Sequence, residues 1–252
     1  MRIPVFAANW KMFKTSREAV AYVREFSALV KAISDVEIVL AAPFTAIAAA
    51  AEAARNTAIG IAAQDLYFEP EGAYTGEISA GMISEAGAEY VIIGHSERRR
   101  LFRDTDEWVN KKLRAALTGG LSPIVCVGET LEERERGNTL AVLDRQTRLA
   151  LDGVTGDEVA GLIIAYEPVW AIGTGKIATP AEAGEAHTHI RTRLREWFGP
   201  VPADTCRLQY GGSVKPDNIR DLIALPDVDG ALVGGASLDV RSFYEIVSRS
   251  RG

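Results

Sequence analysis

The chain repeats one pattern along its whole length, in which a short apolar segment is followed by a longer amphipathic one. The apolar segments are rich in Val and Ile and are mostly continuous rather than alternating in polarity. A parallel β-strand that is buried on both faces has this pattern. We therefore expect strands at residues 3–8, 36–42, 59–63, 90–94, 121–127, 161–166, 206–210 and 230–233.

The longer segments carry start signals for helices. Thr15 precedes Glu18 by three residues, and Thr179 precedes Glu182 by the same spacing, with a proline directly after the threonine. A hydroxyl at the N-cap and a glutamate three residues later satisfy the free N–H groups of the first helical turn. The sequence thus predicts strands that alternate with helices.

Eight strand–helix pairs in 252 residues correspond to about 31 residues per pair, the length of one βα unit. Eight parallel strands can close into a barrel, which leaves no edge strand exposed. A doubly wound open sheet is the alternative, but it would normally carry a Gly-x-Gly-x-x-Gly fingerprint after its first strand, and none is found there. We predict an α/β fold with a single (β/α)8 barrel domain over residues 1–252.

Composition and charge exclude several classes of protein. Hydrophobic residues make up 47% of the chain, which excludes a disordered protein, and the net charge of −6 argues against a nucleic-acid or membrane-surface partner. No stretch of about 18 apolar residues is present to span a bilayer. The two cysteines, Cys126 and Cys206, are too far apart in sequence for a metal pair and indicate a reducing compartment. We expect a soluble, cytoplasmic protein.

The active site of a barrel gathers at the C-terminal ends of its strands. The residues at these ends include a carboxylate, an imidazole, an ammonium and paired glycines: Asn9, Lys11, Gln64, His95, Cys126, Glu129, Glu167, Gly211, Gly212, Ser213, Gly234 and Gly235. Because buried strands rarely end in so many polar groups, we interpret this set as a candidate site.

Each titratable member of the set also has a structural interpretation. Most single lysines lie on the surface, although Lys11 directly follows a buried strand. A lone histidine is usually structural, but His95 precedes a predicted helix, whose positive N-terminal end would favour a neutral, donating imidazole. Glu167 fits a paired carboxylate and a catalytic base equally well.

The glycine pairs indicate a phosphate. Successive N–H groups in turns, exposed where glycine has no Cβ, form concave anion sites. In barrels, the loops after the seventh and eighth strands commonly bind phosphate, and these loops contain Ser213 and the pair Gly234 and Gly235. A phosphorylated substrate is therefore expected.

Three other motifs do not predict separate sites. The segment 173–176 resembles the end of a P-loop, but Ile177 replaces the Ser or Thr that would hold Mg²⁺, so we interpret 168–176 as a mobile glycine-containing loop. His187 and His189 point to different sides of a helix, which disfavours a metal site. Cys126 has no base marked for it and is interpreted as a small buried residue.

Together, these segments resemble the triosephosphate isomerase family in order and over the whole chain. The resemblance rests on residues 9–12 (NWKM), 94–99 (GHSERR), 126–129 (CVGE), 165–175 (AYEPVWAIGTG) and 210–214 (YGGSV). It implies interconversion of dihydroxyacetone phosphate and glyceraldehyde 3-phosphate through an enediolate, a step of glycolysis and gluconeogenesis, with no cofactor or metal. Two departures, Tyr74 where the family often has Phe and Ile177 where it often has Thr or Val, do not affect the reacting atoms.

The resemblance also implies roles for individual residues. Glu167 would be the base, His95 the electrophile, and Lys11 the third catalytic group. Lys11 and Asn9 would bind the substrate. The phosphate would be held by Gly173, Ser213, Gly234 and Gly235.

The segment between Gln64 and Ser79 has neither a strand nor a helix pattern, yet it contains Leu66, Tyr67, Phe68 and Tyr74. A loop of about 15 residues without secondary structure is usually functional, and a monomer rarely exposes such an apolar patch. The loop could fold back on its own barrel. The resemblance instead implies that it inserts into a neighbouring subunit, so we expect a homodimer through the 65–79 loop.

Three other functions remain open from the sequence. The first is an isomerase for a related phosphorylated ketose, such as a four-carbon one, because an extra hydroxymethyl group changes binding only modestly. The second is a Schiff-base aldolase with Lys11 as the nucleophile. The third is a barrel that binds a phosphorylated ligand without turnover, although a binding protein does not need Glu167.

Overall fold

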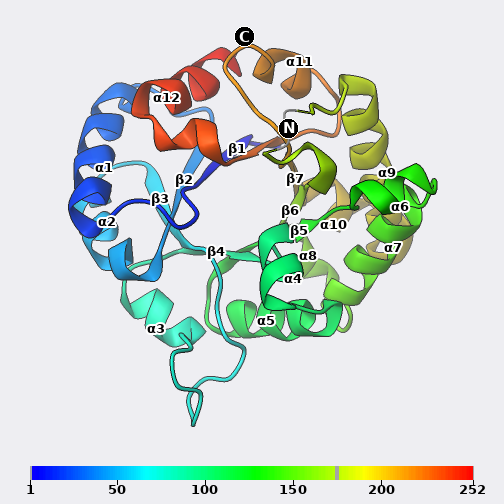
Figure 1. Ribbon diagram of the computed structural model, residues 1–252, viewed down its shortest axis with the longest axis horizontal. Coiled ribbons are helices and arrows are strands. Elements are labelled where there is room, and N and C mark those ends of the chain that lie inside the picture. The colour runs from blue at the N-terminus through cyan, green and yellow to red at the C-terminus, as the bar shows by residue number, and fades with distance from the viewer. Residues whose placement is uncertain (1, 174–175, 252) are drawn as a thin grey trace.

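The computed structural model describes residues 2–173 and 176–251. Within these residues, eight parallel strands follow one another around a closed barrel, and the last pairs with the first (Figure 1). The predicted (β/α)8 barrel is confirmed: each apolar segment contains one strand, and β1 extends one residue beyond its expected end, to Asn9. The strands are β1 (Val5–Asn9), β2 (Glu37–Ala42), β3 (Ile59–Ala63), β4 (Tyr90–Ile93), β5 (Ser122–Val127), β6 (Ile163–Tyr166), β7 (Arg207–Tyr210) and β8 (Gly230–Val233).

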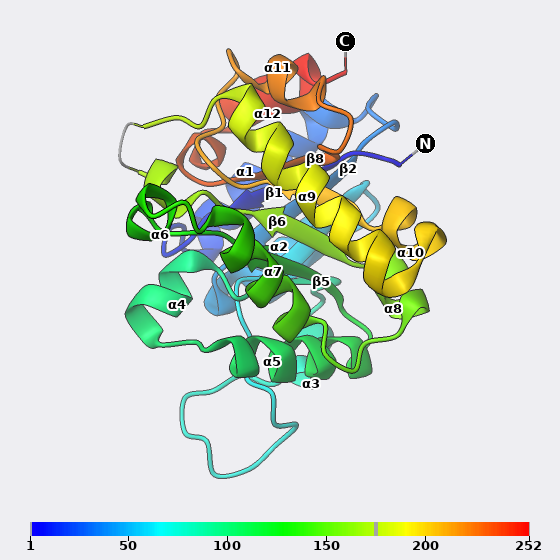
Figure 2. The same ribbon diagram turned by 90° about the vertical axis from the view of Figure 1, so that its right-hand side faces the viewer.

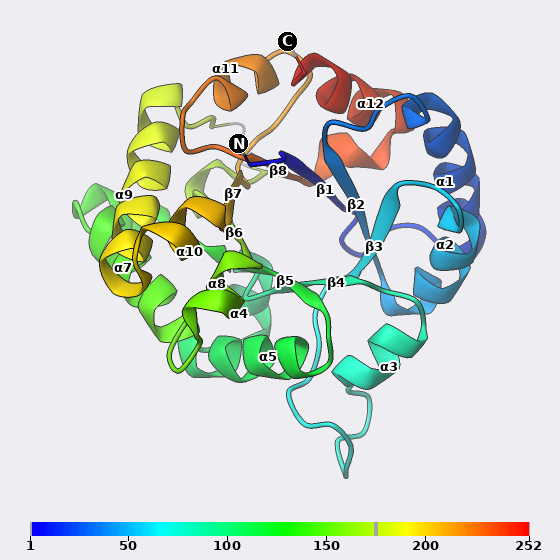
Figure 3. The same ribbon diagram turned by 180° about the vertical axis from the view of Figure 1, so that it is seen from behind.

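Helices form a ring outside the strands, as Figures 1 and 3 show from opposite ends of the barrel. They are α1 (Ser16–Val30), α2 (Ile47–Ala54), α3 (Ala80–Glu85), α4 (Ser96–Phe102), α5 (Asp106–Thr118), α6 (Leu131–Glu135), α7 (Thr139–Ala150), α8 (Gly156–Ala160), α9 (Pro180–Phe198), α10 (Pro200–Thr205), α11 (Ile219–Ile223) and α12 (Val240–Arg249). Short 3-10 turns are η1 (Phe44–Ala46), η2 (Val169–Ala171) and η3 (Gly235–Leu238). No helix in the described part of the chain combines the length and apolar composition of a membrane span.

The predicted start signals cap their helices. The side chain of Thr15 accepts a hydrogen bond from the N–H of Glu18, and the Glu18 carboxylate accepts from the N–H of Thr15. Thr179 and Glu182 make the same reciprocal pair at the start of α9. These contacts satisfy N–H groups that have no partner within the helix.

The core has two layers, which explains why the strands are apolar on both faces. Alternate strand residues meet inside the barrel, where Val5, Val39, Ile92 and Cys126 belong to one buried cluster. The residues between them face the helices, as Phe6 does. Burial raises the pKa of the Cys126 thiol well above its ordinary value, and the negative charge of Glu167 adds to this effect. Cys126 is thus a buried core residue with an unreactive thiol.

The 65–79 loop projects from the barrel beside α3 and α5, as the cyan segment in Figure 2 shows. Its base is tied by an isolated parallel bridge between Tyr67 and Ser79. The Tyr67 ring stacks on Phe68 with centroids 4.3 Å apart and lies 4.8 Å from the ring of Tyr74. Leu66 is only 1% exposed, so the prediction that it belongs to the apolar patch is wrong. It lies three residues after the end of β3, close enough to the barrel for its side chain to join the buried core.

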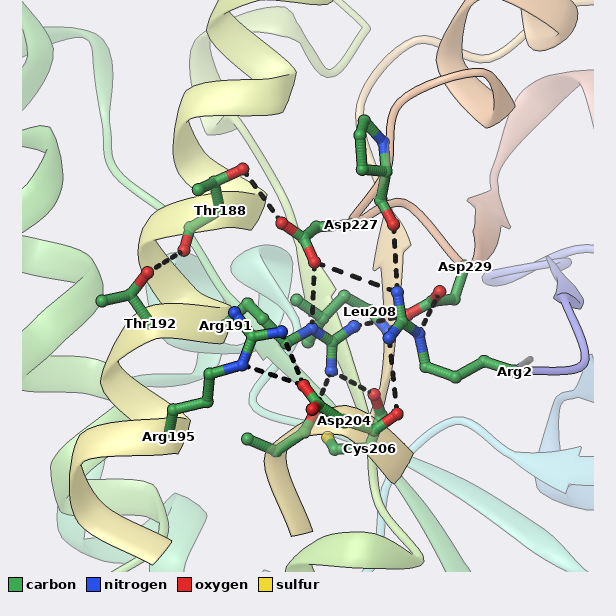
Figure 4. A network of polar contacts seen from close by, with 12 residues as sticks. Arg2, Thr188, Arg191, Thr192, Arg195, Asp204, Cys206, Leu208, Asp227 and Asp229 are labelled. Atoms are coloured by element: carbon green, nitrogen blue, oxygen red, sulfur yellow. Dashed lines mark hydrogen bonds and ion pairs between the residues drawn. The ribbon is translucent and has the colours of Figure 1, made fainter. Parts of the chain in front are cut away.

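A buried ion network lies at the N-terminal ends of the strands (Figure 4). Arg191 of α9 is fully buried, and its guanidinium lies 2.6 Å from Asp229 and 3.3 Å from Asp227. It also donates to the carbonyls of Ala203 and Cys206. Arg2 lies 2.5 Å from Asp229 on the other side. The network therefore fastens α9 and the N-terminal segment to the starts of β7 and β8.

We expect Arg191→Met to destabilise the fold by about 3 to 5 kcal/mol, because the Asp229 carboxylate stays buried after losing a partner. Arg195→Met is the matched control. Arg195, which like Arg191 belongs to α9, pairs with Asp204 of α10. Because these two side chains are each 48% exposed, the loss of this pair should cost less than about 1 kcal/mol. Urea unfolding at one fixed protein concentration measures both changes. Equal losses for the two variants would contradict this account of the network.

Candidate active site

One cavity of about 410 Å³ opens at the C-terminal ends of the strands. The residues to which the family resemblance assigns roles all line it: Asn9, Lys11, His95, Glu167, Gly173, Ser213, Gly234 and Gly235. These residues lie at the end of β1 and in the segments after β1, β4, β6, β7 and β8. Barrel closure brings together groups that are more than 200 residues apart in sequence. Gln64, Cys126 and Glu129, which the strand-end set also contains, do not line the cavity, so their inclusion in the candidate site is wrong.

The loop after β1 presents an ammonium group to the cavity. Asn9 is buried as the last residue of β1, and its side-chain oxygen accepts the N–H of Lys11 at 3.0 Å. Lys11 has a φ of 52°. Residues other than glycine rarely adopt this left-handed backbone conformation, and those that do are often found at functional sites. Nζ of Lys11 lies 2.6 Å from a carboxylate oxygen of Glu97.

The loop between β4 and α4 fixes one imidazole tautomer. His95 is the N-cap of α4, and its Nδ1 accepts the N–H of Glu97 at 3.2 Å. Because an accepting nitrogen carries no proton, the proton of the neutral ring is on Nε2. Gly94 has a φ of 71°, and a Cβ there would lie 2.9 Å from the Val109 side chain, so this tight turn requires glycine.

The carboxylate of Glu167 faces His95 across the cavity. It is 2% exposed; one of its oxygens lies 3.0 Å from Nε2 of His95, and the other accepts the N–H of Ser96 at 3.0 Å. Two glycines make room for this residue. A Cβ at Gly211 would lie 2.9 Å from Cγ of Glu167, and one at Gly128 would lie 1.7 Å from its carbonyl oxygen.

The third wall of the cavity is built from glycine turns after β7 and β8. Gly211, Gly212 and Ser213 follow β7, while Gly234 and Gly235 lead from β8 into η3. A Cβ at Gly234 would meet the stem of Lys11 at 3.4 Å. The turn thus lies directly beside the Lys11 side chain.

The segment 168–176 begins at the active-site carboxylate. Thr174 and Gly175, which the sequence assigns to this loop, lie outside the described residues. Its first part forms η2, and the indole N–H of Trp170 donates to Glu129 at 2.8 Å. The same Glu129 oxygen accepts from the hydroxyl of Tyr166 at 3.2 Å. Glu129 is fully buried and does not line the cavity, so its contacts bind the start of this segment to the barrel.

The two nearby histidines of α9 have separate environments. His187 is fully buried, and its Nδ1 lies 2.8 Å from the carbonyl of Ala183, whereas His189 lies 2.7 Å from Asp144. Across residues 2–173 and 176–251, no cluster of three His, Cys, Asp or Glu side chains is arranged to hold a metal ion.

The sequence model described as triosephosphate isomerase matches residues 4–250. The chain belongs to the triosephosphate isomerase family. The triosephosphate isomerases of Citrifermentans bemidjiense and Carboxydothermus hydrogenoformans are each 55% identical to it over 250 residues, which cover 99% of this chain and 100% of each relative. The crystal structure of the Bartonella henselae triosephosphate isomerase superposes with a TM-score of 0.90 at 41% identity, over 99% of this chain and 100% of that one. The resemblance and the isomerase class predicted from the sequence are confirmed.

In this family member, His95 and Glu167 each change the pKa of the other. Burial opposes the charge of the ring, but attraction and hydrogen bonding by Glu167 outweigh burial and raise the pKa of His95 above its ordinary value. Burial also opposes the charge of Glu167, but His95 and the Ser96 N–H outweigh it and lower the pKa of Glu167. The helix start beside His95 predicts a lowered pKa for this ring, because it disfavours the charged form. That prediction is wrong, because it does not include the charge of the Glu167 carboxylate.

Three contacts in the site were not predicted from the sequence. The N–H of Ser96 holds Glu167, the carboxylate of Glu97 pairs with Lys11, and Gly128 gives space to the Glu167 backbone. Ser96 and Glu97 follow His95 in the family motif, which is a signal of importance but does not identify their partners. Ile172 and Leu232 add apolar walls that carry no sequence signal of their own.

The pair also predicts the titration of His95 in a variant. Glu167→Gln removes the negative charge that stabilises the imidazolium, so the pKa of His95 should fall relative to the parent protein. The ring should then stay neutral to a lower pH. Ring ¹⁵N shifts in a pH series of the unliganded protein measure this change, with Glu185→Gln on α9 as the control. An unchanged His95 midpoint in Glu167→Gln would contradict the assigned cause.

Proposed function

We propose that this chain interconverts dihydroxyacetone phosphate and D-glyceraldehyde 3-phosphate by proton transfer through an enediolate. The observation that carries the proposal is the contact between Glu167 and Nε2 of His95, 3.0 Å apart in a cavity that Lys11 also lines. Moving a carbonyl group between adjacent carbons needs a base that removes a proton from one carbon and returns it to the other. It also needs donors for the oxygens that become negatively charged.

Glu167 is the proposed base. Its carboxylate takes the proton from the carbon beside the carbonyl, and the electron pair of that C–H bond forms the enediolate. The same carboxylate, now protonated, returns the proton to the neighbouring carbon. A second proton must move between the two oxygens: Nε2 of His95 gives its proton to the former carbonyl oxygen and takes one from the hydroxyl oxygen, which becomes the new carbonyl. The Ser96 N–H stabilises the charged carboxylate in the unliganded site. When the carboxylate turns toward substrate, it loses that hydrogen bond in a buried place and becomes more basic.

His95 and Lys11 are the proposed donors. The acceptor role of Nδ1 supports a proton on Nε2, which can then donate to an enediolate oxygen. Lys11 supplies a positive charge beside the same oxygens, and Asn9 orients the Lys11 backbone through its hydrogen bond. The turn glycines Gly234 and Gly235, with Ser213 and Gly173, are proposed to hold the phosphate.

The named relatives support the three-carbon substrate rather than a four-carbon ketose. The geometry of Lys11 argues against the Schiff-base alternative. Its Nζ lies 2.6 Å from Glu97 in a salt bridge, which attack of this nitrogen on a carbonyl would have to break. A barrel that only binds a phosphorylated ligand would have no use for a buried carboxylate facing an imidazole.

We expect Glu167→Gln to lower kcat by about 10²- to 10⁴-fold, because the amide keeps the shape of the side chain but cannot accept the proton. A coupled assay on glyceraldehyde 3-phosphate measures this, with circular dichroism to verify folding. Glu185→Gln, which removes an exposed carboxylate of α9, should leave kcat unchanged. Activity of Glu167→Gln within about tenfold of the parent would rule out Glu167 as the base.

We also propose a homodimer built on the 65–79 loop. Tyr74 on this loop is 41% exposed, and Phe13, Leu101 and Phe102 are each more than half exposed on the described surface. Such a set of large apolar side chains supports an interface rather than a solvated face. Two-fold pairing is also the commonest arrangement of homo-oligomers. The tip of the loop would then pack near Lys11 of the other subunit.

The dimer makes activity dependent on association. Thr75→Arg adds a charge at the exposed loop tip, which would be buried without a partner in the contact. We expect light scattering to show a monomer at about micromolar concentration, with a strongly reduced kcat. Thr192→Arg, an exposed threonine of α9, is the control and should remain a dimer. A parent chain that is monomeric and fully active when dilute would contradict the proposal.

A cytoplasmic location and a single domain over residues 1–252 complete the proposal. The two cysteines, Cys126 and Cys206, are free and buried, as suits a reducing compartment. The closed strand order supports one barrel unit, because each strand bonds to both of its neighbours.

A further inference from the structure

The loop that carries Lys11 contains a second residue with an unusual backbone. Lys14 has a φ of 72°, and Lys11 has a φ of 52° three residues earlier. Left-handed residues other than glycine persist where the surrounding structure holds them in place. We therefore expect contacts of the Lys14 side chain to hold this loop in its conformation.

The ammonium of Lys14 makes three such contacts. It donates to the carbonyl of Leu238 at 2.9 Å, and it lies 4.5 Å from the ring centroid of Tyr22 and 5.4 Å from that of Trp10. Burial lowers the pKa of Lys14, while Glu18 and Asp239 oppose this shift. A partly desolvated cation over two aromatic faces is attracted more strongly than one in water.

Leu238 is the last residue of η3, the short turn that starts at Gly235. Lys11, Gly234, Gly235 and Leu238 all line the active-site cavity, whereas Lys14 is not among the residues that line it. The far side of the contact is also braced, because the hydroxyl of Tyr22 donates to the carbonyl of Ser237 at 2.8 Å. Lys14 thus joins the two loops whose separation sets the width of the cavity at this point.

We propose that Lys14 is a positioning residue, which fastens the Lys11 loop to the Gly235–Leu238 turn and so fixes the Lys11 ammonium relative to the phosphate-binding glycines. The proposal rests on the proposed function for the role of these two loops. Lys14 touches no substrate in this account. Its effect is to reduce the freedom of two substrate-binding elements before the ligand arrives.

A purely local role is the main alternative. In that case Lys14 only completes a turn, and glycine, which adopts a positive φ without strain, would replace it fully. The positioning role and the local role predict different results for Lys14→Gly. This substitution removes the ammonium but favours the backbone conformation. Only the positioning role therefore predicts weaker binding of substrate and phosphate.

The experiment compares Lys14→Met, Lys14→Gly and Lys14→Arg with the parent, and uses Lys31→Met, an exposed lysine at the end of α1, as the control. Three quantities are measured: KM and kcat for glyceraldehyde 3-phosphate, the Kd of inorganic phosphate by calorimetry, and Tm. Arginine keeps a cation that stacks on aromatic rings and donates to carbonyls.

We expect Lys14→Met and Lys14→Gly each to raise KM and the phosphate Kd by about tenfold, the scale of a lost charged hydrogen bond with its cation–π contacts. Lys14→Arg should stay within about threefold of the parent, and Lys31→Met should not differ from it. If Lys14→Met does not fold, Lys14→Gly and Lys14→Arg still give the decisive comparison.

Two results would overturn the proposal: parent-like KM and phosphate Kd in Lys14→Gly, or a lower Tm in the variants with both constants unchanged. A parent protein that binds phosphate but does not isomerise would instead refute the proposed function. The phosphate Kd of the variants would still test the positioning role.

Discussion

Each strand of the barrel pairs with two neighbours, and β8 closes the circle on β1, so all of the carboxyl ends meet at one rim. The candidate site depends on this closure. Asn9, His95, Glu167 and Gly234 each stand at or just after the end of a strand, and they line one cavity although they are far apart in sequence. Glycines at the same rim give the backbone space for close approach, as Gly211 does beside Glu167.

Burial makes charged groups in this protein unfavourable, and nearby donors and opposite charges offset that cost. Burial disfavours the charge of the Glu167 carboxylate, and the His95 ring, the Ser96 N–H and the positive charge of Lys11 together favour its ionised form. The same logic holds away from the cavity, where buried Arg191 is matched by Asp227 and Asp229. The difference is that Glu167 can exchange its partners for a ligand, whereas Arg191 is enclosed on all sides by protein groups.

The sequence predicts the architecture well because each buried strand is a run of neighbouring apolar residues. Every strand and the positions of the polar groups at strand ends could be read from runs of neighbouring residues. Contacts between loops could not be read in this way. The pairing of Lys11 with Glu97, the burial of Leu66 and the raised pKa of His95 depend on which side chains meet in space. The helix start beside His95 was visible in the sequence, but the carboxylate that reverses its effect comes from another strand.

Proton transfer by the buried Glu167 carboxylate differs from a direct hydride shift in whether solvent hydrogen enters the product, and isotope exchange measures this difference. Glyceraldehyde 3-phosphate is converted in D₂O, and the dihydroxyacetone phosphate formed is examined by ¹H NMR before it can exchange again. A carboxylate that carries the proton between two carbons should exchange part of it with solvent, so that a share of the product contains one deuterium on the carbon that was the aldehyde. Product that contains only protium at that carbon would indicate a direct hydride shift and would contradict the account.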